Sequence, residues 1–263
     1  MGSFFAAVAE LENNGEGGAV CTIIESHGST PRHEGSKMLV YSDGRIMGTV
    51  GGGEIESRVI NEALQSISDG KTRMLHYNMS NPQAGDPGVC GGQVDVYVEP
   101  VVPQPLMVII GGGHVGKAVV HLAHWLGFRV AVSDDRPEFC TPQANPDADY
   151  FYLTPMAELP DKLKITLSTY LILTTRGVAV DVPGLPPLLS SSAGYIGVIG
   201  SKRRWSLTCK GLIEKGIPEE IINRVRSPIG LELNAETPEE IAVSIMAEII
   251  MLRHNGTGKV MSE

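Results

Sequence analysis

Residues 105–136 read PLMVIIGGGHVGKAVVHLAHWLGFRVAVSDDR, and this stretch decides the fold of the chain. Residues 106–110 form an apolar run of strand length, residues 114–126 have the apolar spacing of a helix, and residues 128–132 form a second apolar run. Three glycines between the first run and the helix complete the pattern G-x-G-x-x-G, namely Gly111, Gly113 and Gly116. The stretch therefore predicts the first β-α-β unit of a nucleotide-binding α/β fold.

Each part of this fingerprint has a physical role. Gly111 allows a tight turn, Gly113 lets the backbone approach a pyrophosphate, and Gly116 lets the helix pack closely on the strand. The N-terminus of the helix faces the anion, and His114 within the fingerprint is a candidate for a hydrogen bond to a ligand phosphate. Asp134 closes the second strand about 20 residues beyond the glycines, where an acceptor for a ribose 2′-hydroxyl belongs. These residues are a candidate site for NAD(P) or another nucleotide.

The remainder of the C-terminal half continues the alternation of strands and helices. Further strands are predicted at residues 150–153, 170–174 and 195–199, and a capping box at residues 237–240 (TPEE) predicts the start of a last helix. We therefore expect a Rossmann-like, doubly wound parallel sheet. Residues 174–177 (TTRG) and 200–204 (GSKRR) follow two of these strands, at the edge where open α/β sheets bind ligands.

The N-terminal half has a different pattern. Strands are predicted at residues 19–25, 37–41, 46–50, 73–79 and 93–99, with a helix at 54–67. This arrangement predicts a smaller α+β domain. Residues 99–105 (EPVVPQP) contain three prolines and are typical of a stiff linker. We therefore expect an N-terminal domain of residues 1–102 and a C-terminal nucleotide-binding domain of residues 103–263.

Composition excludes some partners. The formal net charge is −9 and no cluster of Lys and Arg is present, which argues against nucleic acid, because phosphates are bound by concentrated positive charge. No apolar run approaches the roughly 18 residues of a membrane span, and the opening MGSFFAAVAELENNGEGG has acids where a signal peptide needs bases. We expect no membrane contact and a cytoplasmic location. The four cysteines form no C-x-x-C pair, so neither a zinc site nor a disulfide framework is expected.

Three glycine-rich segments of the N-terminal half are candidate binding loops. Residues 27–32 (HGSTPR) contain Ser29 and the cation Arg32, and residues 51–54 (GGGE) place Gly52 and Gly53 at a helix start. In both, backbone N–H groups can point at an anion, although a tight turn and a helix cap explain them equally well. Cys90 lies in residues 88–92 (GVCGG), where flexible backbone exposes a thiol that can act as a nucleophile or a soft-metal ligand.

Taken together, these motifs resemble those of the XdhC/CoxI family, the accessory proteins of xanthine dehydrogenase and related molybdenum hydroxylases. In the N-terminal half the resemblance rests on residues 28–32 (GSTPR), 48–56 (GTVGGGEIE) and 88–92 (GVCGG). In the C-terminal half it rests on residues 111–116 (GGGHVG), 134–139 (DDRPEF), 195–201 (YIGVIGS), 228–231 (PIGL) and 237–241 (TPEEI).

The resemblance implies a maturation chaperone. Such a protein binds the molybdenum cofactor (molybdopterin), protects it while a cysteine desulfurase supplies its terminal sulfur, and delivers it to a molybdenum hydroxylase such as xanthine dehydrogenase. Cys90 matches the family's cysteine and is a candidate molybdenum ligand or sulfur carrier. The glycine loop would hold the phosphate or nucleotide end of the cofactor. A homodimer is a further hypothesis.

One departure and two alternatives accompany this interpretation. Members of the family often have Thr-Arg-Gly-His after the central strand, whereas here Val178 follows Gly177. An NAD(P)-dependent oxidoreductase is the first alternative, although no proton-relay set such as Tyr-x-x-x-Lys is evident in the second domain. A nucleotidyltransferase acting on the pterin cofactor is the second, although no cluster of Asp and Glu flanks the glycine loops to hold magnesium.

Overall fold

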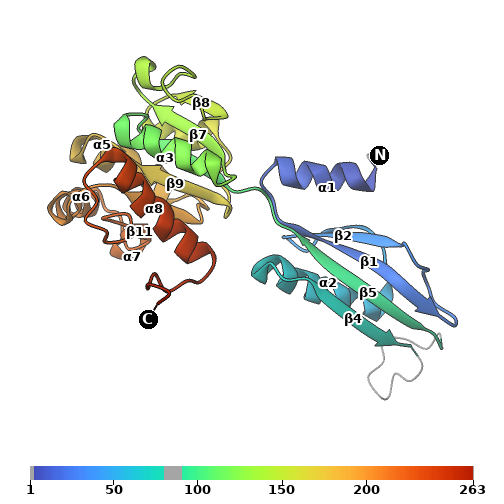
Figure 1. Ribbon diagram of the computed structural model, residues 1–263. Helices are drawn as coiled ribbons and strands as arrows, with labels where there is room; N and C mark the ends of the chain where they lie inside the picture. The colour runs from blue at the N-terminus through green and yellow to red at the C-terminus, as the bar shows by residue number, and fades with distance from the viewer. Residues whose placement is uncertain (1–2, 80–90, 263) are drawn as a thin grey trace. The chain divides into compact units, whose positions relative to one another are not determined.

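The computed structural model describes residues 3–79 and 91–262. The chain divides into two compact units, Met1–Pro103 and Gln104–Glu263. Each unit has its own sheet and its own hydrophobic core (Figure 1). We describe the two units one at a time.

The first unit contains a five-stranded antiparallel sheet in the order β3-β2-β1-β5-β4. Its strands are β1 (Gly18–His27), β2 (Lys37–Tyr41), β3 (Ile46–Gly48), β4 (Arg73–Asn78) and β5 (Gln93–Val101), and its helices are α1 (Phe4–Asn13) and α2 (Gly53–Asp69). Alternate residues of β5 are buried, and α2 buries Ile55, Val59 and Ala63 in the same core. Helix and sheet therefore bury each other's apolar face, which confirms the predicted α+β class.

The strand β5 extends further than the sequence suggested. Pro100 and Val101 pair with β1 instead of forming part of a linker. The pairing of β4 with β5 ends at Arg73 opposite Val98, so Pro100 lies where β5 is paired on one side only. A proline is tolerated there because it interrupts no ladder on the unpaired side.

The second unit contains a six-stranded parallel sheet in the order β11-β10-β9-β6-β7-β8. Its strands are β6 (Leu106–Ile110), β7 (Arg129–Asp134), β8 (Tyr150–Leu153), β9 (Thr169–Leu173), β10 (Tyr195–Val198) and β11 (Val225–Arg226). Counted from β6, this is the order 3-2-1-4-5-6 of the Rossmann fold, and the chain reverses direction across the sheet between β6 and β9.

Helices cover both faces of this sheet. On one face α3 (His114–Trp125) packs against α8 (Pro238–Arg253), and on the other lie α5 (Val178–Leu189) and α6 (Lys202–Glu214) (Figure 1). Short helices complete the unit: η2 (Pro137–Phe139), η3 (Met156–Glu158), α4 (Leu159–Lys162) and α7 (Glu219–Ile222). A separate apolar cluster forms on each face, which confirms the predicted doubly wound architecture.

Candidate functional site

The glycine loop between β6 and α3 is tightly packed except at one position. Gly111 has φ +112°, and a Cβ there would lie 2.6 Å from the carbonyl oxygen of Thr174. A Cβ on Gly116 would overlap the carbonyl oxygen of Gly111, whereas a Cβ on Gly113 would meet no atom within 4 Å. The geometry fits a turn at Gly111, close helix packing at Gly116 and an open approach at Gly113.

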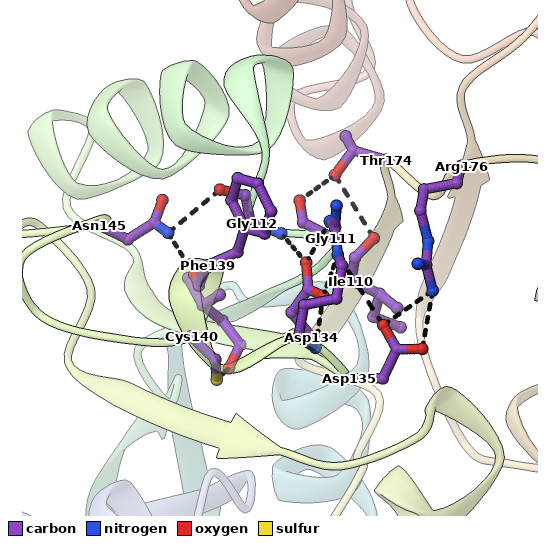
Figure 2. Close-up of polar contacts among 12 residues, drawn as sticks. Ile110, Gly111, Gly112, Asp134, Asp135, Phe139, Cys140, Asn145, Thr174 and Arg176 are labelled. Carbon is purple, nitrogen blue, oxygen red and sulfur yellow. Dashed lines mark hydrogen bonds and ion pairs between the residues drawn. The ribbon is translucent and has the colours of Figure 1, made fainter.

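Side chains from three directions hold this loop in place (Figure 2). The hydroxyl of Thr174 donates to the carbonyl oxygen of Gly111 at 2.6 Å, and Nδ2 of Asn145 donates to that of Gly112 at 3.3 Å. The N–H of Gly112 donates to Oδ2 of Asp134 at 2.8 Å. The loop is thus preorganised by the protein itself.

The N-terminus of α3 has the features of an anion site. Gly113 is the N-cap and has no side chain that could cap the helix, and the first turn contains no acid. The first N–H groups of a helix have no intrahelical partner, and the helix dipole favours negative charge near them. His114 is exposed at the same end. An anionic group approaching Gly113 would meet these N–H groups.

Asp134 is buried, and hydrogen bonds occupy both oxygens of its carboxylate. Its carboxylate accepts four hydrogen bonds, from the N–H of Gly112, the N–H of Arg136, and Nε and Nη2 of Arg136. A carboxylate offers about four lone-pair positions. Burial acts to raise the pKa of Asp134, but the hydrogen bonds from Arg136 and Gly112 outweigh it and lower the pKa below its ordinary value. Asp134 therefore remains an anion that holds the glycine loop to Arg136.

A cavity of about 230 Å³ opens beside this loop, on the α5 face of the sheet. It lies at the carboxyl ends of β6, β7 and β9, where ligands bind in open α/β sheets. Its apolar wall comes from β6, η3 and α5, and its polar groups lie at the end of β7 or in the segments that follow β7, β8 and β9. An apolar pocket with a few convergent polar groups is the usual form of a small-molecule site.

An ion pair between Asp135 and Arg176 lines this cavity. Nη2 of Arg176 lies 2.9 and 2.7 Å from the two carboxylate oxygens of Asp135 (Figure 2). The side chains are 49% and 45% exposed, so the pair is in contact with solvent. The sequence pointed to residues 174–177 as a source of a cation, but it did not single out Asp135. The only signal was its position directly after Asp134.

A second network stabilises the loop that contains Arg176. Asp181 is fully buried and accepts hydrogen bonds from the hydroxyl of Thr175 and from Nε and Nη2 of Arg204, the latter two at 3.1 and 2.7 Å. Nη1 of Arg204 also donates to the carbonyl oxygen of Thr175 at 3.2 Å. Residues 200–204 thus provide a cation that fixes the neighbouring loop from within. The sequence did not predict this role for Arg204.

The candidate loops of the first unit converge at one place. A Cβ on Gly28 would lie 3.2 Å from the carbonyl oxygen of Gly91, and a Cβ on Gly92 would overlap that of Ser29. A Cβ on Gly51 would lie 2.8 Å from the ring of Pro31, so the third loop joins the other two. Gly52 is the N-cap of α2 and Gly53 its first residue, and Ser29 and Arg32 are exposed.

Cys90 lies outside the described residues, directly before Gly91 of this group of loops. The predicted site residues therefore form two sets, one in each unit. Residues 3–79 and 91–262 contain no group of three or more His, Cys, Asp or Glu side chains placed to hold a metal ion. Within the same residues, every helix is too short or too polar to cross a membrane.

Comparison with protein families gives two matches. The model of the XdhC Rossmann domain matches residues 107–249, and the model of the XdhC and CoxI family matches residues 11–78. Together the two models cover β1 to β4 of the first sheet and almost the whole of the second sheet, whereas β5 lies between the two matches.

Three curated proteins are similar to the chain. YqeB of Escherichia coli (strain K12), named as an uncharacterized protein, is 35% identical over 261 residues, 98% of this chain and 48% of that protein. A protein of Bacillus subtilis (strain 168), named as a probable xanthine dehydrogenase subunit, is 31% identical over 60% of this chain and 46% of that protein. The molybdenum cofactor insertion chaperone PaoD of Escherichia coli (strain K12) is 25% identical over 91% of this chain and 85% of that protein. The chain spans about half the length of the first two relatives.

One solved structure matches almost the whole chain. It is described as a xanthine dehydrogenase from Bacillus halodurans and has a TM-score of 0.52 and 23% sequence identity. The match covers 99% of this chain and 98% of the other. At this identity the similarity shows a shared fold.

Proposed function

Because the chain belongs to the XdhC and CoxI family, we propose that it is an accessory protein that binds the molybdenum cofactor as cargo for insertion into a molybdenum hydroxylase. The name of PaoD as a molybdenum cofactor insertion chaperone supports this role. The name of the Bacillus subtilis relative supports a hydroxylase of the xanthine dehydrogenase type as the partner.

The observation that carries the proposal is the preorganised glycine loop at the N-terminus of α3. Its open position at Gly113, the absence of acid in the first helical turn and the nearby cation Arg176 favour an anionic ligand. The cofactor offers such an anion in its phosphate or nucleotide end. The loop would hold this end without contributing to any reaction.

We assign the metal end of the cargo to Cys90. The thiolate of a cysteine is a soft ligand suited to molybdenum or to carrying sulfur. The loop of residues 27–32 lies against Gly91 and Gly92, and its Pro31 lies against Gly51, so the chain on the C-terminal side of Cys90 contacts the first loop directly and the second through Pro31. A cysteine desulfurase would supply the sulfur, and the hydroxylase would then accept the completed cofactor.

An NAD(P)-dependent oxidoreductase is the second candidate. The strand order of the second unit and its glycine loop favour it, because both are typical of dinucleotide-binding domains. The saturated carboxylate of Asp134 weighs against it, because the usual acceptor for the ribose of NAD has no lone pair left.

The test is binding of the molybdenum cofactor to purified protein under anaerobic, reducing conditions, with NAD and NADP titrated in parallel. We expect the wild type to retain the cofactor and Cys90→Ala to lose it about 10-fold more readily, since one metal–ligand bond is removed. Cys209→Ala is the control, because Cys209 is a half-buried thiol of the second unit. Equal retention by all three proteins would refute the role of Cys90. Tight NAD(P) binding without cofactor binding would favour the oxidoreductase.

A further inference from the structure

We propose that the cavity on the α5 face of the second unit binds a ribonucleotide, with Asp135 as the acceptor for its ribose hydroxyls. This inference extends the proposed function. It rests on that function only if the bound nucleotide is the nucleotide end of the molybdenum cofactor. It also assigns to Asp135 the role that the sequence position of Asp134 suggested.

Asp134 cannot take this role without losing contacts that the fold uses. Its side chain is 2% exposed, and its four hydrogen bonds join the glycine loop to Arg136. A ribose hydroxyl would have to displace the N–H of Gly112 or the guanidinium of Arg136. The buried N–H of Gly112 would then be left without its acceptor, or the partly buried Arg136 would lose its carboxylate, and either loss costs stability.

Asp135 is paired mainly with Arg176, because Nε of Arg136 lies 4.0 Å from its carboxylate. Its carboxylate is 45% exposed and bound to Arg176, which is 49% exposed. Exposed ion pairs contribute little to stability, so a ligand can replace one side of the pair at small cost. A ribose diol would donate two hydrogen bonds to Asp135, and Arg176 would be released to meet the phosphate. Both side chains already line the cavity.

The cavity itself suits the base of a nucleotide. Ile110, Met156, Val180 and Pro183 form an apolar wall against which a flat ring can pack. A volume of about 230 Å³ is below the range of about 300–1,000 Å³ that is usual for drug-sized ligands, so it fits part of a nucleotide and not a whole dinucleotide. The remainder of the ligand would extend toward the glycine loop at Gly111, which borders the same cavity.

Ser133 is an independent indication that a polar ligand atom binds in the cavity. It lines the cavity, is fully buried, and its hydroxyl has no hydrogen-bond partner in the described part of the chain. Buried hydroxyls without a partner are uncommon because they lose their hydration without compensation. A heteroatom at the edge of a base, reached after a small adjustment of the wall, would satisfy it.

The first experiment is calorimetric titration of the full chain with AMP, CMP, GMP and UMP and with their 2′-deoxy counterparts. We expect at least one ribonucleotide to bind the wild type, and its deoxy form to bind about 10-fold more weakly, because one hydrogen bond to a carboxylate is lost. Absence of binding by all four ribonucleotides, or equal affinity for the ribo and deoxy forms, would overturn the proposal.

Variants show which residue discriminates between the ribonucleotide and its deoxy form. Asp135→Asn should bind the ribonucleotide and its deoxy form with nearly equal affinity, whereas Asp161→Asn, an exposed acid on α4 outside the cavity, should discriminate as the wild type does. The readout is the ratio of the affinities for the ribonucleotide and for its deoxy form. A single affinity is not sufficient, because release of Arg176 can itself alter phosphate binding. Discrimination that survives in Asp135→Asn would refute the assignment. Ser133→Ala should bind the ribonucleotide more weakly without lowering the unfolding midpoint, because the hydroxyl that it removes has no hydrogen-bond partner in the described part of the chain.

A second titration separates this inference from the proposed function. Molybdenum cofactor with and without a nucleotide is offered to the wild type. Ribonucleotide binding with the expected discrimination, but without retention of either cofactor, would refute the chaperone and leave the nucleotide site. Retention of the cofactor with no ribonucleotide binding would refute the nucleotide site and leave the chaperone.

Discussion

The carboxylate of Asp134 joins the glycine loop to the guanidinium of Arg136, and we expect this contact to stabilise the fold. Asp134→Asn removes the charge and one acceptor oxygen, leaving Arg136 and the N–H of Gly112 competing for a single oxygen. Because Arg136 is 27% exposed and can regain some hydration, we expect a loss of about 2–3 kcal/mol in the free energy of unfolding, less than for a fully buried pair. Urea unfolding measures it. Asp161→Asn serves as the control and should change stability by less than about 0.5 kcal/mol.

The same residue predicts a dependence of stability on pH. The pKa of Asp134 in the folded protein is below its ordinary value, because its hydrogen bonds outweigh burial, whereas in the unfolded chain it is about 3.9. A carboxyl with a lowered folded pKa stabilises the fold above its unfolded pKa, and this contribution is lost as the pH falls through the folded value. The stability difference between wild type and Asp134→Asn should therefore be constant from about pH 6 to 8 and narrow below about pH 4. A difference that persists unchanged at low pH would contradict this account.

Some single-residue contacts of the site could be predicted from the sequence and others could not. The turn at Gly111 and the close packing at Gly116 were predictable because they follow from backbone geometry that any such turn requires. The contacts of Asp134 were not, because they depend on the rotamer of Arg136, two positions further along the chain. The pairing of Asp181 with Arg204 joins the starts of two helices that are separated by a strand, and no local pattern indicates it.

At the scale of elements, most strands were predicted from runs of apolar residues, and α8 from its capping box, which the structure contains. The alternation of strands and helices implied a helix between residues 174 and 195, but the bounds of α5 were not predicted. It contains Pro183, Pro186 and Pro187, and proline removes a helical hydrogen bond and clashes with the preceding turn. On its buried face, Leu185, Leu188 and Leu189 pack into the core. This packing outweighs the low helix propensity of the three prolines. Local sequence does not reveal that compensation.

The junction of β6 with α3 gives a matched pair of predictions. Gly116→Ala places a methyl group onto the carbonyl oxygen of Gly111, so α3 must shift, and we expect a loss of about 1–3 kcal/mol in the free energy of unfolding. Gly113→Ala enters open space at φ −70°, a conformation that alanine accepts, and should leave stability within about 0.5 kcal/mol. The same methyl group stands where a phosphate would approach, so Gly113→Ala should weaken cofactor binding. Equal stability of the two variants would show that the helix is not held closely against the loop.

At the scale of the whole molecule, each unit has a core of its own, and we expect each to unfold as its own cooperative transition. Both tryptophans, Trp125 and Trp205, lie in the second unit, so their fluorescence follows that unit alone, whereas far-ultraviolet circular dichroism follows both. Ile23→Ala in the first core and Leu171→Ala in the second each remove a fully buried side chain, and each should cost about 2–5 kcal/mol. Leu171→Ala should lower the denaturant midpoint of the fluorescence transition, while Ile23→Ala should leave that midpoint in place and shift only the dichroism. If Ile23→Ala shifts the fluorescence midpoint by the same amount, the two units unfold as one.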